Sequence, residues 1–209
     1  MLKKSIGTTS LLNVGLTPQL RLISLLTENE TIDGVTHDGY GGFPVQAVQN
    51  YFNLADWTIA MLRTSGRVVL YGQRIAALAG HRYRVDYSKH WNELFVAARV
   101  QFFHGTFMSV LRRDGLSPVR RYAIYGSSSA YPNAKVPGKG NSPFTVYVRV
   151  DLEALLAAET HRVFVRGSEV LLVPSIETMP VPVRFLKFFQ PNVTLRKLEP
   201  LAVQQVRMQ

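Results

Sequence analysis

The 209-residue sequence is 46% hydrophobic, enough for the core of one domain or two small ones, which excludes a disordered chain. Its 24 Lys and Arg against 14 Asp and Glu give a formal net charge of +10, which either favours a polyanionic partner such as RNA or only keeps the protein soluble. The absence of cysteine excludes disulfides, thiolate metal sites and a cysteine nucleophile, so that any catalysis would use His, Arg, Ser or carboxylates.

The N-terminal segment, residues 1–20, has a composition of its own. It contains Lys3, Lys4 and several Ser and Thr, and no acidic residue precedes Glu28. This composition is typical of a mitochondrial presequence, and it equally fits an ordered N-terminal arm of a cytoplasmic protein. No stretch approaches the roughly 18 to 20 apolar residues of a membrane-spanning helix, so no membrane partner is expected.

Residues 21–90 are predicted to form a winged-helix-like lobe. The expected elements, in chain order, are helices over 18–26, 45–52 and 55–63 and a β-hairpin of strands 67–71 and 74–78. The helices are predicted from apolar residues at helical spacing, and the hairpin is predicted from two apolar runs that flank Gly72-Gln73. Helices followed by a two-stranded wing are the pattern of a small winged-helix module.

Residues 91–185 are predicted to form an α+β lobe on a split or curved sheet, after a link over 81–91. The expected elements are strands over 95–103, 121–125, 144–150, 163–165 and 170–173, a helix over 106–113, and a helix over 151–158 that Asp151 caps. The Ser, Gly, Pro and Lys rich run 127–142 is either a connector or a loop that contacts phosphates through Lys135 and Lys139.

The C-terminal extension, residues 186–209, mixes apolar and basic residues and contains no catalytic pattern. It begins Leu186-Lys187-Phe188-Phe189, in which aromatic and basic residues are neighbours. Exposed, such residues suit docking onto a protein or RNA surface. Buried, they would form a final strand that completes the core.

Short motifs between residues 21 and 183 occur in an order that resembles one enzyme family. They are Leu25-Leu26, Gly34-Val35-Thr36 with Asp38, Gly42-Phe43-Pro44-Val45, 74–81, Phe103-His104-Gly105-Thr106, Gly115-Leu116-Ser117-Pro118, 150–156 and 164–172. The family is that of the RNA 2′-phosphotransferases, NAD-dependent enzymes of tRNA splicing. The resemblance implies two lobes, one winged-helix-like and one with the split β-sheet of ADP-ribosyltransferases.

The resemblance also implies a reaction, in which an RNA 2′-phosphate attacks the NAD ribose carbon that bears nicotinamide. Cations are needed to hold two anionic reactants together. The family's Arg-His pair falls on Thr27 and Glu28 here, and this reversal of charge implies a loss of about 2–5 kcal/mol of transition-state binding. Arg67 and Arg166 fall on two retained catalytic arginines, unless they are ordinary surface residues.

Four residues are candidates for cofactor binding by the same resemblance: His104, Gly105, Thr106 and Arg121. His104 would hydrogen-bond a ribose of NAD. The alternative is structural, because Gly105 allows a tight bend and Thr106 can cap a following helix. The remaining histidines lack metal-ligand spacing, so no metal is expected.

Two hypotheses about function follow. The favoured one is a degenerate relative without a cofactor, an RNA-binding or structural component that contacts the protein subunits of a ribonucleoprotein, such as a mitochondrial ribosome or an RNA-processing complex. The alternative is an active RNA 2′-phosphotransferase or ADP-ribosyltransferase that uses NAD through His104, Arg67 and Arg166.

Overall fold

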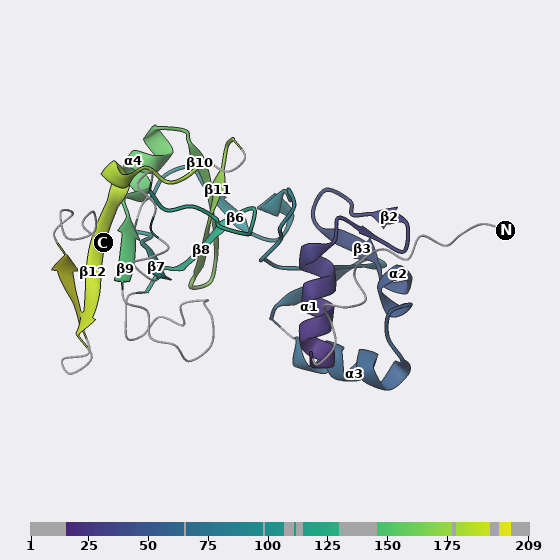
Figure 1. Ribbon diagram of the computed structural model, residues 1–209. Coiled ribbons are helices and arrows are strands. Elements are labelled where there is room, and N and C mark those ends of the chain that lie inside the picture. Colours follow the sequence, from purple (N-terminus) through teal and green to yellow (C-terminus); the bar gives the residue numbers. More distant parts are fainter. Residues whose placement is uncertain are drawn as a thin grey trace. The chain divides into compact units, whose positions relative to one another are not determined.

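The computed structural model has an α+β fold divided into two compact units, residues 1–86 and 87–209 (Figure 1). The structure describes residues 16–64, 66–97, 99–106, 111, 115–129, 146–176, 179–192 and 197–201. Among the described residues, the first unit holds two small sheets and three of the four α-helices, and the second holds one large sheet. Most of the expected N-terminal arm, residues 1–15, lies outside the described residues.

The first unit contains the three predicted helices and the predicted hairpin. Its elements are α1 (Pro18–Glu28), β1 (Thr31–Ile32), β2 (Val35–Thr36), β3 (Gly42–Pro44), α2 (Val45–Gln49), α3 (Leu54–Arg63), β4 (Val68–Tyr71) and β5 (Arg74–Ala77). β1 pairs with β2, and the hairpin β4–β5 gains β3 as a third antiparallel strand. The sequence did not predict β3, which follows a turn-rich segment.

Local caps and one ion pair fix how α1 and α3 begin and pack. Thr17 accepts a hydrogen bond from the Leu20 amide, and Asn53 accepts one from the Asp56 amide at 2.8 Å. Arg21 of α1 then pairs with Asp56 of α3. Both helices contribute to one buried core, α3 through Ala60, and its other buried residues include Leu22, Leu26, Ile32, Phe43, Val48 and Ile75.

The second unit is built on an eight-stranded, wholly antiparallel sheet in the order β13-β12-β9-β7-β8-β11-β10-β6. Its strands are β6 (Asn92–Leu94), β7 (Phe102–Thr106), β8 (Ile124–Ser127), β9 (Val146–Val150), β10 (His161–Arg166), β11 (Glu169–Pro174), β12 (Leu186–Asn192) and β13 (Lys197–Leu201). The helical segments are η1 (Tyr87–Lys89), α4 (Leu152–Ala157) and η3 (Val183–Phe185). Asp151 caps α4, as predicted, by accepting from the Ala154 amide.

The middle of this sheet contains a seam between β7 and β8. Within the described residues these strands share one residue pair, Phe103 opposite Ser127, whereas β7 pairs with β9 over five. Beyond that pair, the His104 side chain contacts the Tyr125 carbonyl. In the order of the eight strands, four lie on each side of this seam.

Three predictions for the second unit are corrected by the structure. The strand over 95–103 is wrong, because Phe95 and Val96 are 81% and 72% exposed and β7 begins only at Phe102. The strand over 121–125 is shifted to β8. Thr106 does not begin a helix but ends β7, and residues 107–110, 112–114 and 130–145 lie outside the described residues, with most of the predicted helix and the predicted loop.

The C-terminal extension continues the sheet. Leu186 and Phe188 of β12 are buried, and β12 lies between β9 and β13. This matches the alternative in which residues after 185 complete the core. Residues 202–209 lie outside the described residues.

Buried His161 predicts a loss of stability on acidification. Its Nε2 donates to the Met179 carbonyl at 3.2 Å, and burial lowers its pKa from 6.5 to about 4. The unfolded chain therefore binds a proton at His161 before the folded chain does. We expect the free energy of unfolding to fall as the pH drops from about 6.5 to about 4, by on the order of 3 kcal/mol from this residue.

The measurement is urea unfolding at several pH values, for the wild type and for His161→Gln. Gln keeps an N–H donor for the Met179 carbonyl but does not titrate. The variant should therefore lose less stability across this pH range. Identical pH dependence in both proteins would show that His161 is not the responsible group.

Candidate functional site

Thr27 and Glu28, the first pair of predicted site residues, lie in the last turn of α1. The Thr27 side chain is 5% exposed, and its hydroxyl donates to the Ile23 carbonyl at 2.8 Å. Its own carbonyl accepts from the Arg82 amide at 2.8 Å. Thr27 is therefore a structural residue, because its polar groups are satisfied inside the unit.

Glu28 is paired with a cation that sequence reasoning did not assign to the site. Its Oε1 lies 2.9 Å from Nη2 of Arg82, and both side chains are partly exposed. The pair offsets the negative charge that Glu28 would otherwise present to a phosphate. The sequence identified Glu28 as a departure from the family resemblance, but nothing in the sequence showed that Glu28 meets Arg82.

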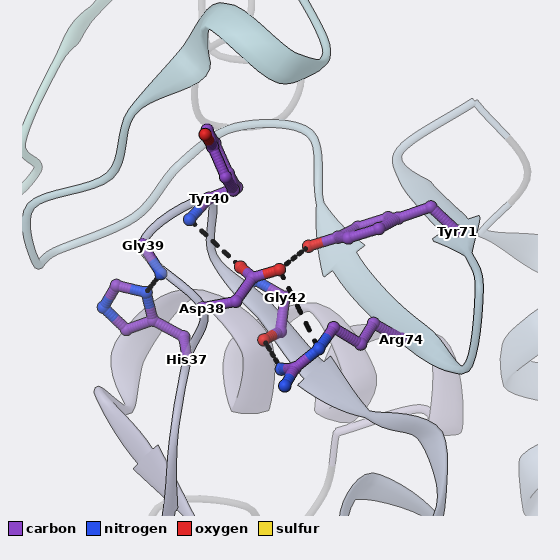
Figure 2. A network of polar contacts seen from close by, with 7 residues as sticks. All are labelled: His37, Asp38, Gly39, Tyr40, Gly42, Tyr71 and Arg74. Atoms are coloured by element: carbon purple, nitrogen blue, oxygen red, sulfur yellow. Dashed lines mark hydrogen bonds and ion pairs between the residues drawn. The ribbon is translucent and has the colours of Figure 1, made fainter.

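A polar network around Asp38 connects β3 and the hairpin β4–β5 (Figure 2). Asp38 Oδ1 accepts from the amides of Tyr40 and Gly42, each at 3.0 Å, and Oδ2 accepts from the Tyr71 hydroxyl at 2.9 Å. Arg74 donates to the Gly42 carbonyl at 2.9 Å, and its Nε lies 3.9 Å from Oδ2. The carboxylate is thus held by groups from three segments.

The electrostatics of this network favour an ionised Asp38. Burial opposes ionisation, but the hydrogen bonds from Gly42, Tyr71 and Tyr40 outweigh it and hold the pKa of Asp38 below its ordinary value. Burial, together with the Asp38 charge, raises the pKa of Tyr71, which therefore remains a donor at neutral pH. With its acceptors and donors matched, the network stabilises the fold rather than serving as an acid or base.

Arg74 also borders a cavity of about 480 Å³ beside the network. The lining is completed by Pro44, Val45 and three glutamines, Gln46, Gln49 and Gln73. A guanidinium among amides can donate to and accept from a polar ligand. Asp38 and Arg74 both lie in motifs of the family resemblance, yet no role was predicted for either of them.

Arg67 lies in the turn that precedes β4. Its side chain is exposed and makes no ion pair or hydrogen bond with the residues that the structure describes. Its backbone continues the turn, because its amide donates to the Thr64 carbonyl at 2.9 Å. The Arg67 guanidinium is therefore accessible to an anionic ligand, as an exposed surface side chain would be.

His104 lies at the seam of the large sheet, on the face that carries the core. Its half-buried ring stacks on that of Phe102, with centroids 6.4 Å apart, and Val148 lies opposite it on β9. Its Nδ1 lies 2.6 Å from the Tyr125 carbonyl oxygen. A carbonyl can only accept, so Nδ1 carries the proton, and in the neutral ring Nε2 is an acceptor.

The surroundings keep this imidazole neutral. Burial is the main cause that lowers the pKa of His104, the positive charge of Arg121 lowers it further, and the hydrogen bond to Tyr125 opposes both. Arg121 therefore lies close enough to His104 for its charge to act on the imidazole. A neutral ring with Nδ1 occupied can accept a hydrogen bond at Nε2 from a ligand hydroxyl, such as that of a ribose.

Gly105 and Thr106 continue β7 and are both buried, the Thr106 side chain at 5% exposure. Arg166 ends β10 on the opposite face of the sheet from His104. The register shows this: Arg166 faces Glu169, Glu169 faces Ser127, and Ser127 faces Phe103, which precedes His104. Cross-strand partners share a face and adjacent residues on a strand alternate.

The described part of the chain contains neither a metal-binding cluster nor a membrane-spanning helix. No group of three or more His, Asp or Glu side chains there is arranged to hold a metal ion. None of the helices seen there is long and apolar enough to cross a membrane. Among known proteins, no family model matches this chain, and no curated protein matches it.

Proposed function

We propose that this protein is a degenerate relative of the RNA 2′-phosphotransferases that has lost catalysis and binds RNA. In this proposal the first unit corresponds to a winged-helix-like lobe and the second to an ADP-ribosyltransferase-like lobe with a split sheet. The protein would act within a ribonucleoprotein, such as a mitochondrial ribosome or an RNA-processing complex. The observation that carries the proposal is the arrangement of Thr27, Glu28 and Arg82.

Phosphoryl and ADP-ribosyl transfer between anions requires cations that are free to hold the reacting groups. At the end of α1 the Thr27 hydroxyl is committed to a backbone carbonyl, and Glu28 is matched by Arg82. Neither side chain can take the part of an Arg-His pair. The local charge is close to balanced, which does not favour a 2′-phosphate at this position.

RNA binding is supported by basic side chains that form no ion pair in the described part of the fold. The chain carries a formal net charge of +10, and Arg67 is exposed with no acidic partner among the residues that the structure describes. Such charge attracts a polyanion by releasing its counterions. The same exposed basic side chains would also be accessible to partner proteins of a ribonucleoprotein.

The second candidate function is an active NAD-dependent RNA 2′-phosphotransferase or ADP-ribosyltransferase. One observation favours it, the neutral His104 whose Nε2 can accept from a ribose hydroxyl. Against it, Arg166 points to the opposite face of the sheet, so that one NAD would have to reach both faces to contact both residues. We therefore rank it second.

Incubation of the purified protein with NAD and an RNA that bears an internal 2′-phosphate separates these functions. The degenerate relative should bind the RNA and leave its 2′-phosphate in place, without forming ADP-ribosylated RNA. Turnover that Arg166→Ala abolishes would overturn the proposal. An inactive protein that also fails to bind RNA would overturn it as well.

Removal of the Glu28 charge should strengthen RNA binding. In Glu28→Gln the Arg82 guanidinium loses its counter-charge and becomes available to a phosphate. We expect the RNA affinity to rise about two- to fivefold at low salt, with a salt dependence steeper by about 0.7 in the log-log slope. Fluorescence anisotropy with a labelled RNA at several salt concentrations measures both.

The control for this prediction is Glu159→Gln, which changes the net charge equally. Glu159 is exposed, lies in the second unit and forms none of the ion pairs seen in the described residues. The same gain in both variants would mean that only net charge matters and that Arg82 has no particular part.

A further inference from the structure

The second unit contains a cavity of about 300 Å³ at the end of β9. Three basic residues from three chain segments contribute to its lining: Arg99, which precedes β7, Arg149 of β9 and Lys187 of β12. Because β7, β9 and β12 are neighbours in the sheet, residues far apart in sequence meet here. None of the predicted site residues lines this cavity.

Two of these cations are direct cross-strand partners. Lys187 lies opposite Arg149 in the register of β9 and β12, so their side chains leave the same face of the sheet. Like charges in this arrangement repel and destabilise a sheet. In the described part of the chain, Arg99, Arg149 and Lys187 form no direct ion pair with a carboxylate.

The two acidic residues in the lining leave the cavity positive. Asp151 is engaged as the cap of α4, where its Oδ1 accepts from the Ala154 amide at 3.1 Å. Glu153, in the first turn of α4, is exposed. Three cations against these two carboxylates give a net positive lining. The guanidinium of Arg149 also lies over the Phe189 ring, 5.9 Å from its centroid, which limits its orientations.

We propose that Arg99, Arg149 and Lys187 form a binding site for a backbone phosphate of single-stranded RNA. The inference rests on the proposed RNA-binding function and assigns part of it to this cavity. A phosphodiester offers anionic oxygens that a guanidinium and an ammonium can share, which relieves the repulsion between Arg149 and Lys187. A concave site of about 300 Å³ suits one nucleotide of a flexible strand, whose backbone can bend into it.

The test is RNA binding by the full chain and its Arg149→Gln and Lys187→Gln variants, measured by fluorescence anisotropy with a labelled single-stranded RNA of about ten nucleotides. The charge-matched control is Arg120→Gln, because Arg120 is exposed in the same unit and lies outside the cavity. We expect each cavity variant to bind about tenfold more weakly, with a salt slope smaller by about 0.7, and the control to change by less than about twofold.

Thermal unfolding of the same proteins without RNA provides a second measurement. Both cavity variants should remain folded. Lys187→Gln should unfold at or above the wild-type temperature, because it removes a like-charge contact, whereas Arg149→Gln removes the same contact but also loses the contact with the Phe189 ring. Folded variants with weaker RNA binding would support the site. Equal RNA binding by the wild type, both cavity variants and the control would overturn the site but leave the proposed function standing. A wild type that does not bind RNA would overturn both.

Discussion

Replacement of Gly115 by alanine should destabilise the second unit by about 3–5 kcal/mol. Gly115 has φ +123°, a conformation that L residues rarely adopt, and an added Cβ would lie 1.9 Å from the Val181 carbonyl oxygen. The neighbouring residue, Leu116, exchanges two backbone hydrogen bonds with Val181, at 3.1 and 2.8 Å. Relief of the clash would separate this pair, and both of its side chains are buried. Urea unfolding of the full chain measures the loss.

Gly167→Ala is the matched control. Gly167 also has positive φ, +59°, but nothing lies within 4 Å of its added Cβ. This variant should lose only the conformational contribution, about 1–2 kcal/mol. Equal losses in the two variants would show that backbone conformation, not the contact with Val181, is what requires glycine at position 115.

Gly42→Ala should destabilise the first unit by about 2–4 kcal/mol. The added Cβ would lie 1.6 Å from the Tyr71 hydroxyl and 3.1 Å from Asp38 Oδ1. The Tyr71 ring must then move away, which removes its hydrogen bond to Asp38 and leaves a partly buried carboxylate short of one donor. Thermal unfolding measures the change.

A double-mutant cycle with Tyr71→Ala identifies the cause. Without the Tyr71 ring, the space beside Gly42 is open, and Gly42→Ala should then add much less destabilisation than it does in the wild type. Strict additivity of the two substitutions would mean that Tyr71 is not the residue that excludes a side chain at position 42.

Much of the first unit could be predicted from the sequence because its signals are local. Helix α3 has apolar residues at helical spacing and begins at Asn53, a favoured capping residue. The hairpin β4–β5 has two apolar runs around Gly72-Gln73. Such signals require only residues a few positions apart. β3 was missed because its partner in β5 is some thirty residues further along the chain.

The second unit was harder to predict because its strands are positioned by distant partners. The run from Phe95 to Phe103 is apolar enough for a strand, yet the first residues are exposed and only Phe102 and Phe103 enter β7. An apolar run does not reveal which part of it will be buried. The limits of β7 are set by β9, where Phe102 meets Val150.

The candidate site shows the same division. The sequence predicted a helix that ends at residue 26, just before Thr27 and Glu28, and the structure includes both in the last turn of α1. It predicted a strand that ends at Phe103, just before His104, and the structure includes His104 in β7. It could not show that Glu28 meets Arg82, because a contact across more than fifty residues leaves no local pattern. The hydrogen bond from Tyr71 to Asp38 could not be predicted from the sequence for the same reason. Spacing also did not reveal that His104 and Arg166 leave opposite faces of one sheet.

The order of strands in the large sheet also bears on folding during synthesis. The sheets of the first unit are complete once β5 has been made. By contrast, β6 pairs within the described residues only with β10, whose residues are synthesised about seventy positions later. Phe102 of β7 pairs with Val150, about fifty residues further along the chain. A nascent chain therefore carries a finished first unit followed by unpaired strand edges and apolar side chains. Those edges are where chaperones would bind and where incomplete chains would aggregate.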